Sequence, residues 1–275
     1  MAYAYPGAGA LDYFPCRYGT SRLLFRGPRR ALDRPYVAVL GGTETYGKYV
    51  PRPYPDLIEA ETGFRMVNLG CVNAGLDVYL NEEAVTQIAA KAEAAVVQLV
   101  GAHNLTNRFY TVHPRRNDRF LAASPLLKSM FRDVEFTDFH FTRHMLMTLQ
   151  AASAERFEAV AEELQAAWLV RMKQLLARLP TKVVLLWMSA HRPPAKAGQT
   201  HLQTEPLLVD TRMIAAIKPM ATAYVEVISS PAAKARGVEG MAFSPLDAPA
   251  AAGLPGPAVH DEVAQRLAPV LEGLL

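Results

Sequence analysis

A hydroxyl residue directly after a buried strand is the first candidate for chemistry in this sequence. Residues 36–47 read Tyr-Val-Ala-Val-Leu-Gly-Gly-Thr-Glu-Thr-Tyr-Gly, so an apolar run ends at two glycines and Thr43 follows at once. Paired glycines let a ligand approach the main chain, and open α/β sheets bind ligands where their strands end. We therefore expect Thr43 to lie in a pocket. The alternative is a simple strand-to-helix turn with Thr43 or Thr45 as the helix N-cap.

Two further apolar runs end in polar turns of the same kind. Residues 65–69 lead into Gly70 and Gly75, and residues 95–100 lead into His103 and Asn104. The carboxyl ends of parallel strands meet at one edge of a sheet, so we expect all three turns to converge there.

Apolar runs alternate with amphipathic stretches along most of the chain. Strands are predicted at residues 36–40, 65–69, 95–100, 182–188 and 223–228, and helices at 53–63, 82–93, 153–179 and 257–271, with a partly helical 207–220. This alternation predicts an α/β fold, a three-layer sandwich around a five-stranded, mostly parallel sheet. Residues 1–35 are expected to form an N-terminal arm and residues 36–275 a single domain.

Residues 108–150 form a long insert between the third strand and the strongest helix. Loops of this length are usually functional or contain helices of their own. We expect short helices at residues 121–130 and 142–152, together forming a helical cap over the edge of the sheet that bears Thr43.

The order of the polar turns resembles the sequence blocks of the SGNH, or GDSL, hydrolase superfamily. That family has a nucleophilic serine after the first strand, oxyanion donors after the second and third strands, and a histidine base before the last helix. The resemblance covers residues 36–275 except the insert, and it implies an esterase or acyltransferase with an SGNH-like or flavodoxin-like sheet. The catalytic residues that it implies are Thr43 as nucleophile, His260 as base, and Gly70, Gly75, His103 and Asn104 around the oxyanion.

Three positions depart from the pattern of that family. Thr43 stands in place of the serine, and its methyl group crowds the path of attack. His103 stands where the family has asparagine. Pro257 stands where the family has the aspartate that orients the base, so Asp247, Asp261 or a backbone carbonyl would have to replace it.

The full length also resembles a domain family of unknown function found in alphaproteobacteria. Residues 18–22, 26–30, 112–120 and 141–144 carry this resemblance. It implies no activity.

Basic residues gather in the insert. They are Arg108, His113, Arg115, Arg116 and Arg119. Arginine forks match carboxylate, phosphate and sulfate groups, so these residues are predicted to bind the anionic end of a small-molecule or carbohydrate ester. The alternative is a set of structural ion pairs with the acidic residues of the insert, which are Asp118, Asp133, Glu135 and Asp138.

A second group of arginines lies between residues 17 and 30 and is interleaved with Tyr18, Leu23 and Phe25. This spacing favours an arm packed on its own domain or on a second subunit, and the latter would make the protein a homo-oligomer. The remaining alternative is an anion-binding segment.

Composition limits the other classes of function. The net charge of +3 gives no reason to expect nucleic acid, and no apolar run is long enough for a membrane span. Residues 1–10 lack the pattern of a secretory signal and only Cys16 and Cys71 occur, so a cytoplasmic location is expected. His140 and His144 have helical spacing without a prescribed third ligand, and neither a metal nor another cofactor is expected.

Two hypotheses follow from the sequence. The first is an SGNH-like esterase or acyltransferase that uses Thr43 on an anionic ester. The second is a catalytically silent protein of the same fold that binds an anionic ligand. Hydrogen bonding between Thr43 and His260 would favour the first, and their separation would favour the second.

Overall fold

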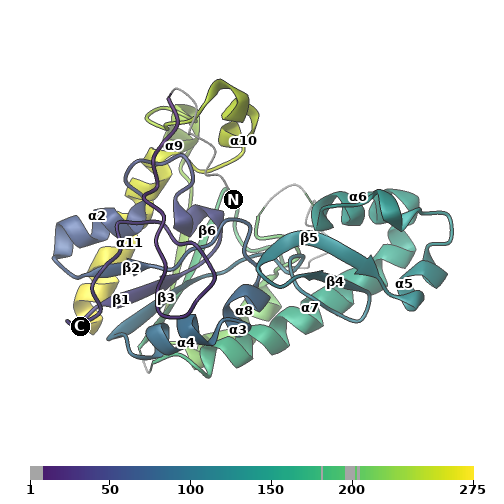
Figure 1. The fold of residues 1–275 in the computed structure, drawn as a ribbon, viewed down its shortest axis with the longest axis horizontal. Helices are drawn as coiled ribbons and strands as arrows, with labels where there is room; N and C mark the ends of the chain where they lie inside the picture. The colour runs from purple at the N-terminus through teal and green to yellow at the C-terminus, as the bar shows by residue number, and fades with distance from the viewer. Residues whose placement is uncertain (1–8, 181, 196–201, 203–204) are drawn as a thin grey trace.

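The central sheet has five parallel strands, as the sequence predicts. In the computed structural model, which describes residues 9–180, 182–195, 202 and 205–275, the strands are β1 (Val37–Leu40), β2 (Met66–Asn68), β3 (Ala94–Gln98), β6 (Val183–Ser189) and β7 (Ala223–Ile228). Their order is β2-β1-β3-β6-β7, and Figure 1 labels the first four of these strands. The chain leaves β1 for one side of the sheet and then returns to the other side at β3. Ligands of such sheets bind at this reversal, beyond the carboxyl ends of the strands.

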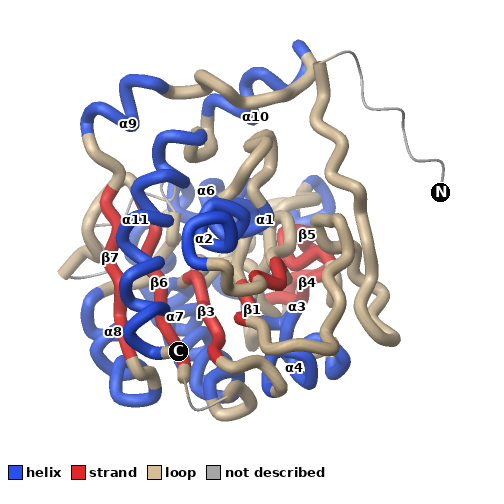
Figure 2. The backbone as a smooth tube through the Cα atoms, turned by 90° about the vertical axis from the view of Figure 1, so that its left-hand side faces the viewer, coloured by secondary structure: helices blue, strands red, loops and turns tan. Residues whose placement is uncertain are grey.

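Helices cover both faces of the sheet. One layer contains α2 (Tyr54–Thr62) and α11 (Pro257–Leu274), and the other contains α3 (Leu76–Leu80), α4 (Glu83–Ala90), α7 (Ala154–Leu176) and α8 (Thr211–Ile217). Figure 2 shows α2 and α11 on the same side of the strands. Alternate strand residues point to opposite layers. Val37 and Val39 thus join the core under α11, whereas Ala38 and Leu40 join the core under α7.

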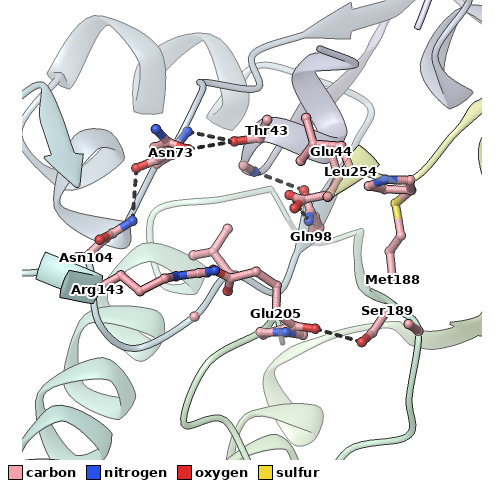
Figure 3. Close-up of a pocket in the computed structure, with 18 of the residues that line it drawn as sticks. Thr43, Glu44, Asn73, Gln98, Asn104, Arg143, Met188, Ser189, Glu205 and Leu254 are labelled. Atoms are coloured by element: carbon pink, nitrogen blue, oxygen red, sulfur yellow. Dashed lines mark hydrogen bonds and ion pairs between the residues drawn. The ribbon is translucent and has the colours of Figure 1, made fainter. Parts of the chain in front are cut away.

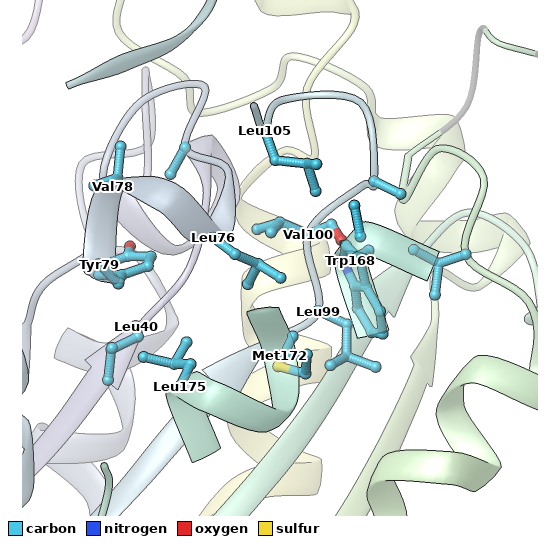
Figure 4. Packing of buried hydrophobic residues seen from close by; sticks show 14 of the residues in the cluster. Leu40, Leu76, Val78, Tyr79, Leu99, Val100, Leu105, Trp168, Met172 and Leu175 are labelled. Atoms are coloured by element: carbon cyan, nitrogen blue, oxygen red, sulfur yellow. The ribbon is translucent and has the colours of Figure 1, made fainter. Parts of the chain in front are cut away.

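The long helix α7 holds the larger of the two cores together. Trp168, Met172 and Leu175 lie against the strand ends and α3, together with Leu40 and Leu99 (Figure 4). The indole Nε1 of Trp168 donates a hydrogen bond to the carbonyl of Val100 at 2.9 Å. The predicted N-cap, Ser153, accepts a hydrogen bond from the backbone N–H of Arg156 at 3.2 Å.

The insert is a hairpin followed by helices, which corrects part of the predicted cap. Strands β4 (Tyr110–His113) and β5 (Arg116–Ala123) pair antiparallel, and α5 (Pro125–Met130), the 3-10 turn η1 (Phe136–Asp138) and α6 (Thr142–Ala152) follow. The helix expected at 121–130 begins only after Ser124, which caps it, because residues 121–123 continue the hairpin. The helix expected at 142–152 is confirmed.

Short elements complete the chain, and several of the short helices differ from expectation. They are α1 (Thr43–Tyr46), the 3-10 turn η3 (Lys218–Met220), α9 (Pro231–Arg236), the 3-10 turn η4 (Pro245–Asp247) and α10 (Ala248–Ala252). Gly42 is the N-cap of α1, so Thr43 is the first helical residue and neither threonine caps the helix. The sequence did not predict α3, which is only five residues long, nor α9 and α10, which lie where a loop was expected. Figure 2 shows α9 and α10 beyond the carboxyl end of β7.

The described part of the N-terminal arm packs on its own domain. Tyr18, Leu23 and Phe25 are buried in the core under α7. The guanidinium of Arg26 donates hydrogen bonds to the carbonyls of Gly47 at 2.8 Å and Pro51 at 2.7 Å. Residues 1–8 of the predicted arm lie outside the described residues, as do residues 196–201 and 203–204 of the loop after β6. None of the helices in the described ranges has the length and apolar character that crossing a bilayer requires.

Replacement of Trp168 by phenylalanine tests the packing of α7. We expect Trp168→Phe to lower the free energy of unfolding by about 1–3 kcal/mol, because it removes the bond to Val100 and leaves a void. Val170→Ala on the exposed side of the same helix should change it by less than about 0.5 kcal/mol. Urea unfolding followed by circular dichroism gives both values. Equal effects from the two variants would contradict this packing.

Candidate functional site

A cavity of about 800 Å³ opens at the carboxyl ends of β1, β3 and β6 (Figure 3). The turn after β1, the turns after β2 and β3, helix α6 and the loop before α11 all contribute to its wall. Its ionisable and amide side chains are Glu44, Asn73, Gln98, His103, Asn104, Asp118, Arg143, His144, Glu205 and Lys234. The turns after β1, β2 and β3 therefore converge on one cavity, as the sequence predicts.

The side-chain amide of Gln98, at the end of β3, fixes the glycine turn. Its Oε1 accepts hydrogen bonds from the backbone N–H of Gly42 at 2.9 Å and from the hydroxyl of Thr45 at 2.6 Å. Its Nε2 donates to Glu44 Oε2 at 2.9 Å. A Cβ on Gly41 would lie 2.1 Å from Thr45 Oγ1 and 2.5 Å from Gln98 Oε1, so only glycine fits there. One buried amide thus sets both the turn and the direction of the Glu44 carboxylate.

The hydroxyl of Thr43 lines the cavity but is hydrogen-bonded to Asn73. Thr43 Oγ1 donates to Asn73 Oδ1 at 3.2 Å and accepts from the Asn73 backbone N–H at 2.9 Å. Asn73 has a φ of 54°, a left-handed conformation that asparagine tolerates. Its Nδ2 continues to Asp118 Oδ2 at 3.2 Å. Because an amide oxygen is not a base, this arrangement orients the hydroxyl without activating it.

His260, the predicted base, belongs to a different environment. It lies in the first turn of α11, is almost fully buried, and does not line the cavity. Its Nδ1 accepts the backbone N–H of Tyr54 at 3.1 Å, and the two rings stack with centroids 6.0 Å apart. Burial, and then the positive charge of Arg26, lowers the pKa of His260 to about 3. His260 is therefore not hydrogen-bonded to Thr43. The side of α11 that carries His260 packs against α2 instead.

Asp247 and Asp261, the possible replacements for the aspartate that would orient the histidine base, lie outside the cavity. Asp247 accepts hydrogen bonds from Tyr49 Oη at 3.1 Å and from Ser244 Oγ at 2.7 Å, and it does not line the cavity. Asp261 is exposed on α11. Neither carboxylate contacts Thr43 in the described structure.

The two glycines predicted as oxyanion donors have their N–H groups occupied. Gly70 donates to Asn68 Oδ1 at 2.9 Å, and Gly75 donates to Asn117 Oδ1 at 3.1 Å. Neither glycine lines the cavity. A Cβ on Gly75 would lie 1.5 Å from the carbonyl oxygen of Asn104, so this glycine serves close packing of two turns.

His103 and Asn104 do line the cavity, as predicted. Asn104 Nδ2 donates to the carbonyl of Asn73 at 3.2 Å, and its Oδ1 accepts from Thr142 Oγ1 at 2.6 Å. The side chain of His103 is 7% exposed, and its Nε2 lies 3.6 Å from Glu205 Oε1. Its Nδ1 has no hydrogen-bond partner among the described residues. Burial, and then Arg143, lowers the pKa of His103 to about 3, so the imidazole is neutral.

The basic residues predicted to hold an anion do not line the cavity. They are Arg108, His113, Arg115, Arg116 and Arg119. Arg108 pairs with Glu163 at 2.9 Å, and the guanidinium of Arg119 lies 4.3 Å from the centre of the Phe141 ring. The other three lie at or beside the hairpin turn between β4 and β5. The cause is the hairpin of β4 and β5, which was not predicted from the sequence.

The insert contributes a different cation to the cavity, Arg143 of α6. Its guanidinium forms an ion pair and a hydrogen bond with Glu205 Oε1. Burial raises the pKa of Glu205, and the charge of Arg143 opposes that shift. Burial, and then the neighbouring Glu205, raises the pKa of Glu44.

Sequence reasoning missed four of these residues. Gln98 carried a signal, because it is a polar residue inside an otherwise apolar strand. Glu44 follows Thr43 directly, but the sequence pattern pointed only to the hydroxyl of Thr43. Arg143 and Glu205 are far apart in the chain, and nothing local indicates that they meet. Within the described ranges, no group of three or more His, Cys, Asp or Glu side chains is placed to hold a metal ion.

Comparisons with known proteins give a family and a set of distant structures. The family model described as "Domain of unknown function (DUF6473)" matches residues 1–275. No curated protein matches. A Lactobacillus plantarum protein of known structure is 15% identical, with 87% of this chain and 97% of that one covered and a TM-score of 0.39.

Two enzymes are also among the structural neighbours. A carbohydrate esterase family 2 enzyme with its carbohydrate binding domain, from Corynascus thermopiles (Myceliophthora fergusii), is 11% identical, with 90% and 68% coverage and a TM-score of 0.39. LAE5, an alpha/beta hydrolase enzyme from the metagenome of Lake Arreo, Spain, is 11% identical, with 88% and 96% coverage and a TM-score of 0.42. Sequence identities and TM-scores this low do not allow either activity to be assigned to this chain.

Removal of the Gln98 amide tests its role in the turn. We expect Gln98→Leu to lower the free energy of unfolding by about 2–4 kcal/mol, because the N–H of Gly42 and the hydroxyl of Thr45 lose their buried acceptor. Gln87→Leu, at an exposed position of α4, is the matched control and should have little effect. Chemical denaturation measures both. A Gln98→Leu protein as stable as the control would contradict this role.

The buried, neutral state of His260 predicts a pH dependence. Its pKa is about 3 in the folded chain and near 6.5 in an unfolded one, so its stabilising contribution is complete above pH 6.5 and is lost as the pH falls towards 3. The stability difference between wild type and His260→Asn should therefore shrink by about 1.4 kcal/mol per pH unit between pH 6 and pH 4. A difference that stays constant with pH would show that His260 titrates normally.

Proposed function

We propose that this chain, which belongs to the DUF6473 family, binds a small molecule that donates hydrogen bonds in the cavity at the ends of β1 and β3. The observation that carries the proposal is the state of Thr43. Its hydroxyl proton is donated to the amide oxygen of Asn73, and the predicted base, His260, accepts a hydrogen bond from Tyr54 instead. A hydroxyl nucleophile needs a base within hydrogen-bond reach. The geometry thus favours ligand binding over acyl transfer.

The cavity wall favours a ligand that donates hydrogen bonds. Three carboxylates line it, from Glu44, Asp118 and Glu205. Carboxylates accept hydrogen bonds and, when ionised, donate none. Hydroxyl and amine groups are the ligand groups that match them. This replaces the anionic ligand expected from the insert arginines, since those arginines lie outside the cavity.

Acyl transfer through Thr43 remains a second candidate because of one observation. His103 lines the same cavity as Thr43, is neutral, and has an Nδ1 without a partner in the described structure. A rotation of either side chain would be needed before this imidazole could accept the Thr43 proton. In this version of the esterase or acyltransferase hypothesis, His103 takes the role first given to His260.

An ester screen separates the two candidates. We expect wild type, Thr43→Ala and Thr43→Ser to hydrolyse short p-nitrophenyl esters and acyl-CoA at the same background rate, because no base is in place. Thr211→Ala, at an exposed position, is the matched control. Turnover that disappears in Thr43→Ala and rises in Thr43→Ser would overturn the binding proposal. Loss of that turnover in His103→Gln but not in His260→Asn would then identify His103 as the base.

A further inference from the structure

The charges on the cavity wall do not cancel. The carboxylates of Glu44, Asp118 and Glu205 face two cations, Arg143 and Lys234. Arg143 is already paired with Glu205, and the exposed Lys234 Nζ donates to the carbonyl of Ala190 at 2.7 Å. Among the described residues, neither Glu44 nor Asp118 has an ion-pair partner within 4 Å. The wall therefore has an excess of negative charge.

We propose that the ligand of this cavity carries a protonated amine, which binds against the carboxylates of Glu44 and Glu205. The inference rests on the proposed function, because it names the ligand class of the same site. An ammonium group has three donors and one positive charge. It would neutralise the excess charge of the wall and pair with the Glu44 carboxylate, which has no cationic partner among the described residues, whereas Glu205 already has Arg143.

Glu44 is the carboxylate that such a ligand would stabilise most. It is half-buried, and its Oε2 is held by Gln98 Nε2 at 2.9 Å, so its position is fixed before a ligand arrives. A partly buried carboxylate without a cation is penalised by desolvation, and a second carboxylate nearby adds repulsion. Both effects act on Glu44, with Glu205 as the neighbour, and both raise its pKa. A ligand ammonium would relieve both at once.

His103 adds a neutral acceptor beside the pair. Its ring is buried, lines the cavity, and has Nε2 3.6 Å from Glu205 Oε1. The pKa of about 3 means that the ring adds no positive charge to repel an amine. The other imidazole of the wall, His144, packs edge-on against Phe139 with ring centroids 5.1 Å apart. The wall thus combines two carboxylates with a neutral imidazole near the proposed ammonium.

An apolar part of the ligand would extend beyond the amine. Met188, Leu254 and Val259 line the same cavity, and Figure 3 shows Met188 and Leu254 on the side of Glu44 away from Asn73. Phe141 and Met147, each about two-fifths exposed at 43% and 41%, add further apolar surface to the wall. A short alkyl chain next to an ammonium fits this combination better than a polar chain does.

Three matched probes test the proposal. They are n-hexylammonium, 1-hexanol and hexanoate, which share a chain and differ in the charge of the head group. We expect wild type at pH 7 and low salt to bind hexylammonium about tenfold more tightly than hexanol, and hexanoate most weakly, because one partly buried charge pair is worth a few kcal/mol at most. Calorimetric titration, with NMR shifts to place the probe in the cavity, measures the three affinities.

Two variants identify the residues responsible. Glu44→Gln keeps the size of the side chain and should remove the preference for hexylammonium over hexanol. Glu205→Gln should weaken hexylammonium and strengthen hexanoate, because it leaves the Arg143 guanidinium without its carboxylate. Glu158→Gln, exposed on α7, is the control and should change none of the affinities. Because the two cavity variants predict different patterns, a folding defect in one still leaves the other as a test.

The outcomes also separate this inference from the function on which it rests. Hexanoate binding more tightly than hexylammonium, or an unchanged preference in Glu44→Gln, would overturn the amine proposal while the cavity remained a binding site. The amine proposal would also be overturned if none of the three probes bound in the cavity. Thr43-dependent ester turnover would instead overturn the binding function, whatever the probes show.

Discussion

The side-chain amide of Gln98 is the interaction on which the cavity depends. It lies at the end of β3, accepts from the turn after β1, and donates to Glu44. Strand ends in a parallel sheet have backbone groups that no further strand pairs, so a buried amide can satisfy several of them at once. The cost of breaking such a network is high because each group is left unpaired in a low-dielectric interior. The turn, the carboxylate and the cavity wall are therefore set together.

The hydrogen bonds of the structure separate two residues that the sequence pattern predicts to act together. The sequence resemblance predicts Thr43 as the nucleophile, yet its hydrogen bonds go to Asn73. His260 occupies the last helix, yet its Nδ1 binds the start of α2. Both residues are hydrogen-bonded to segments that are distant in the chain. Sequence order alone therefore does not establish that two residues act on one another.

Charge on the cavity wall comes from residues that no local motif joins. Glu44 comes from α1, Asp118 from the hairpin, Arg143 from α6 and Glu205 from the loop after β6. The net charge of the wall is negative, whereas the basic residues of the insert predicted a positive site. The reason is that the hairpin places its arginines outside the cavity. Arg108 illustrates this, since its partner is Glu163 on α7. The proposed ligand class follows from the residues of the cavity wall rather than from the composition of the insert.

The pattern of the sequence predicts the five strands of the sheet, the longer helices and the edge at which the cavity lies. Apolar runs ended by glycine are a local signal, and parallel strands bring their carboxyl ends together whatever the details of packing. Which side chains meet depends on the packing of segments that are distant in the chain. The hairpin in the insert, the burial of His260 against Tyr54 and the pairing of Arg143 with Glu205 depend on contacts between distant segments. Such contacts leave no periodicity in the sequence, and so Thr43 was found and its partner was not.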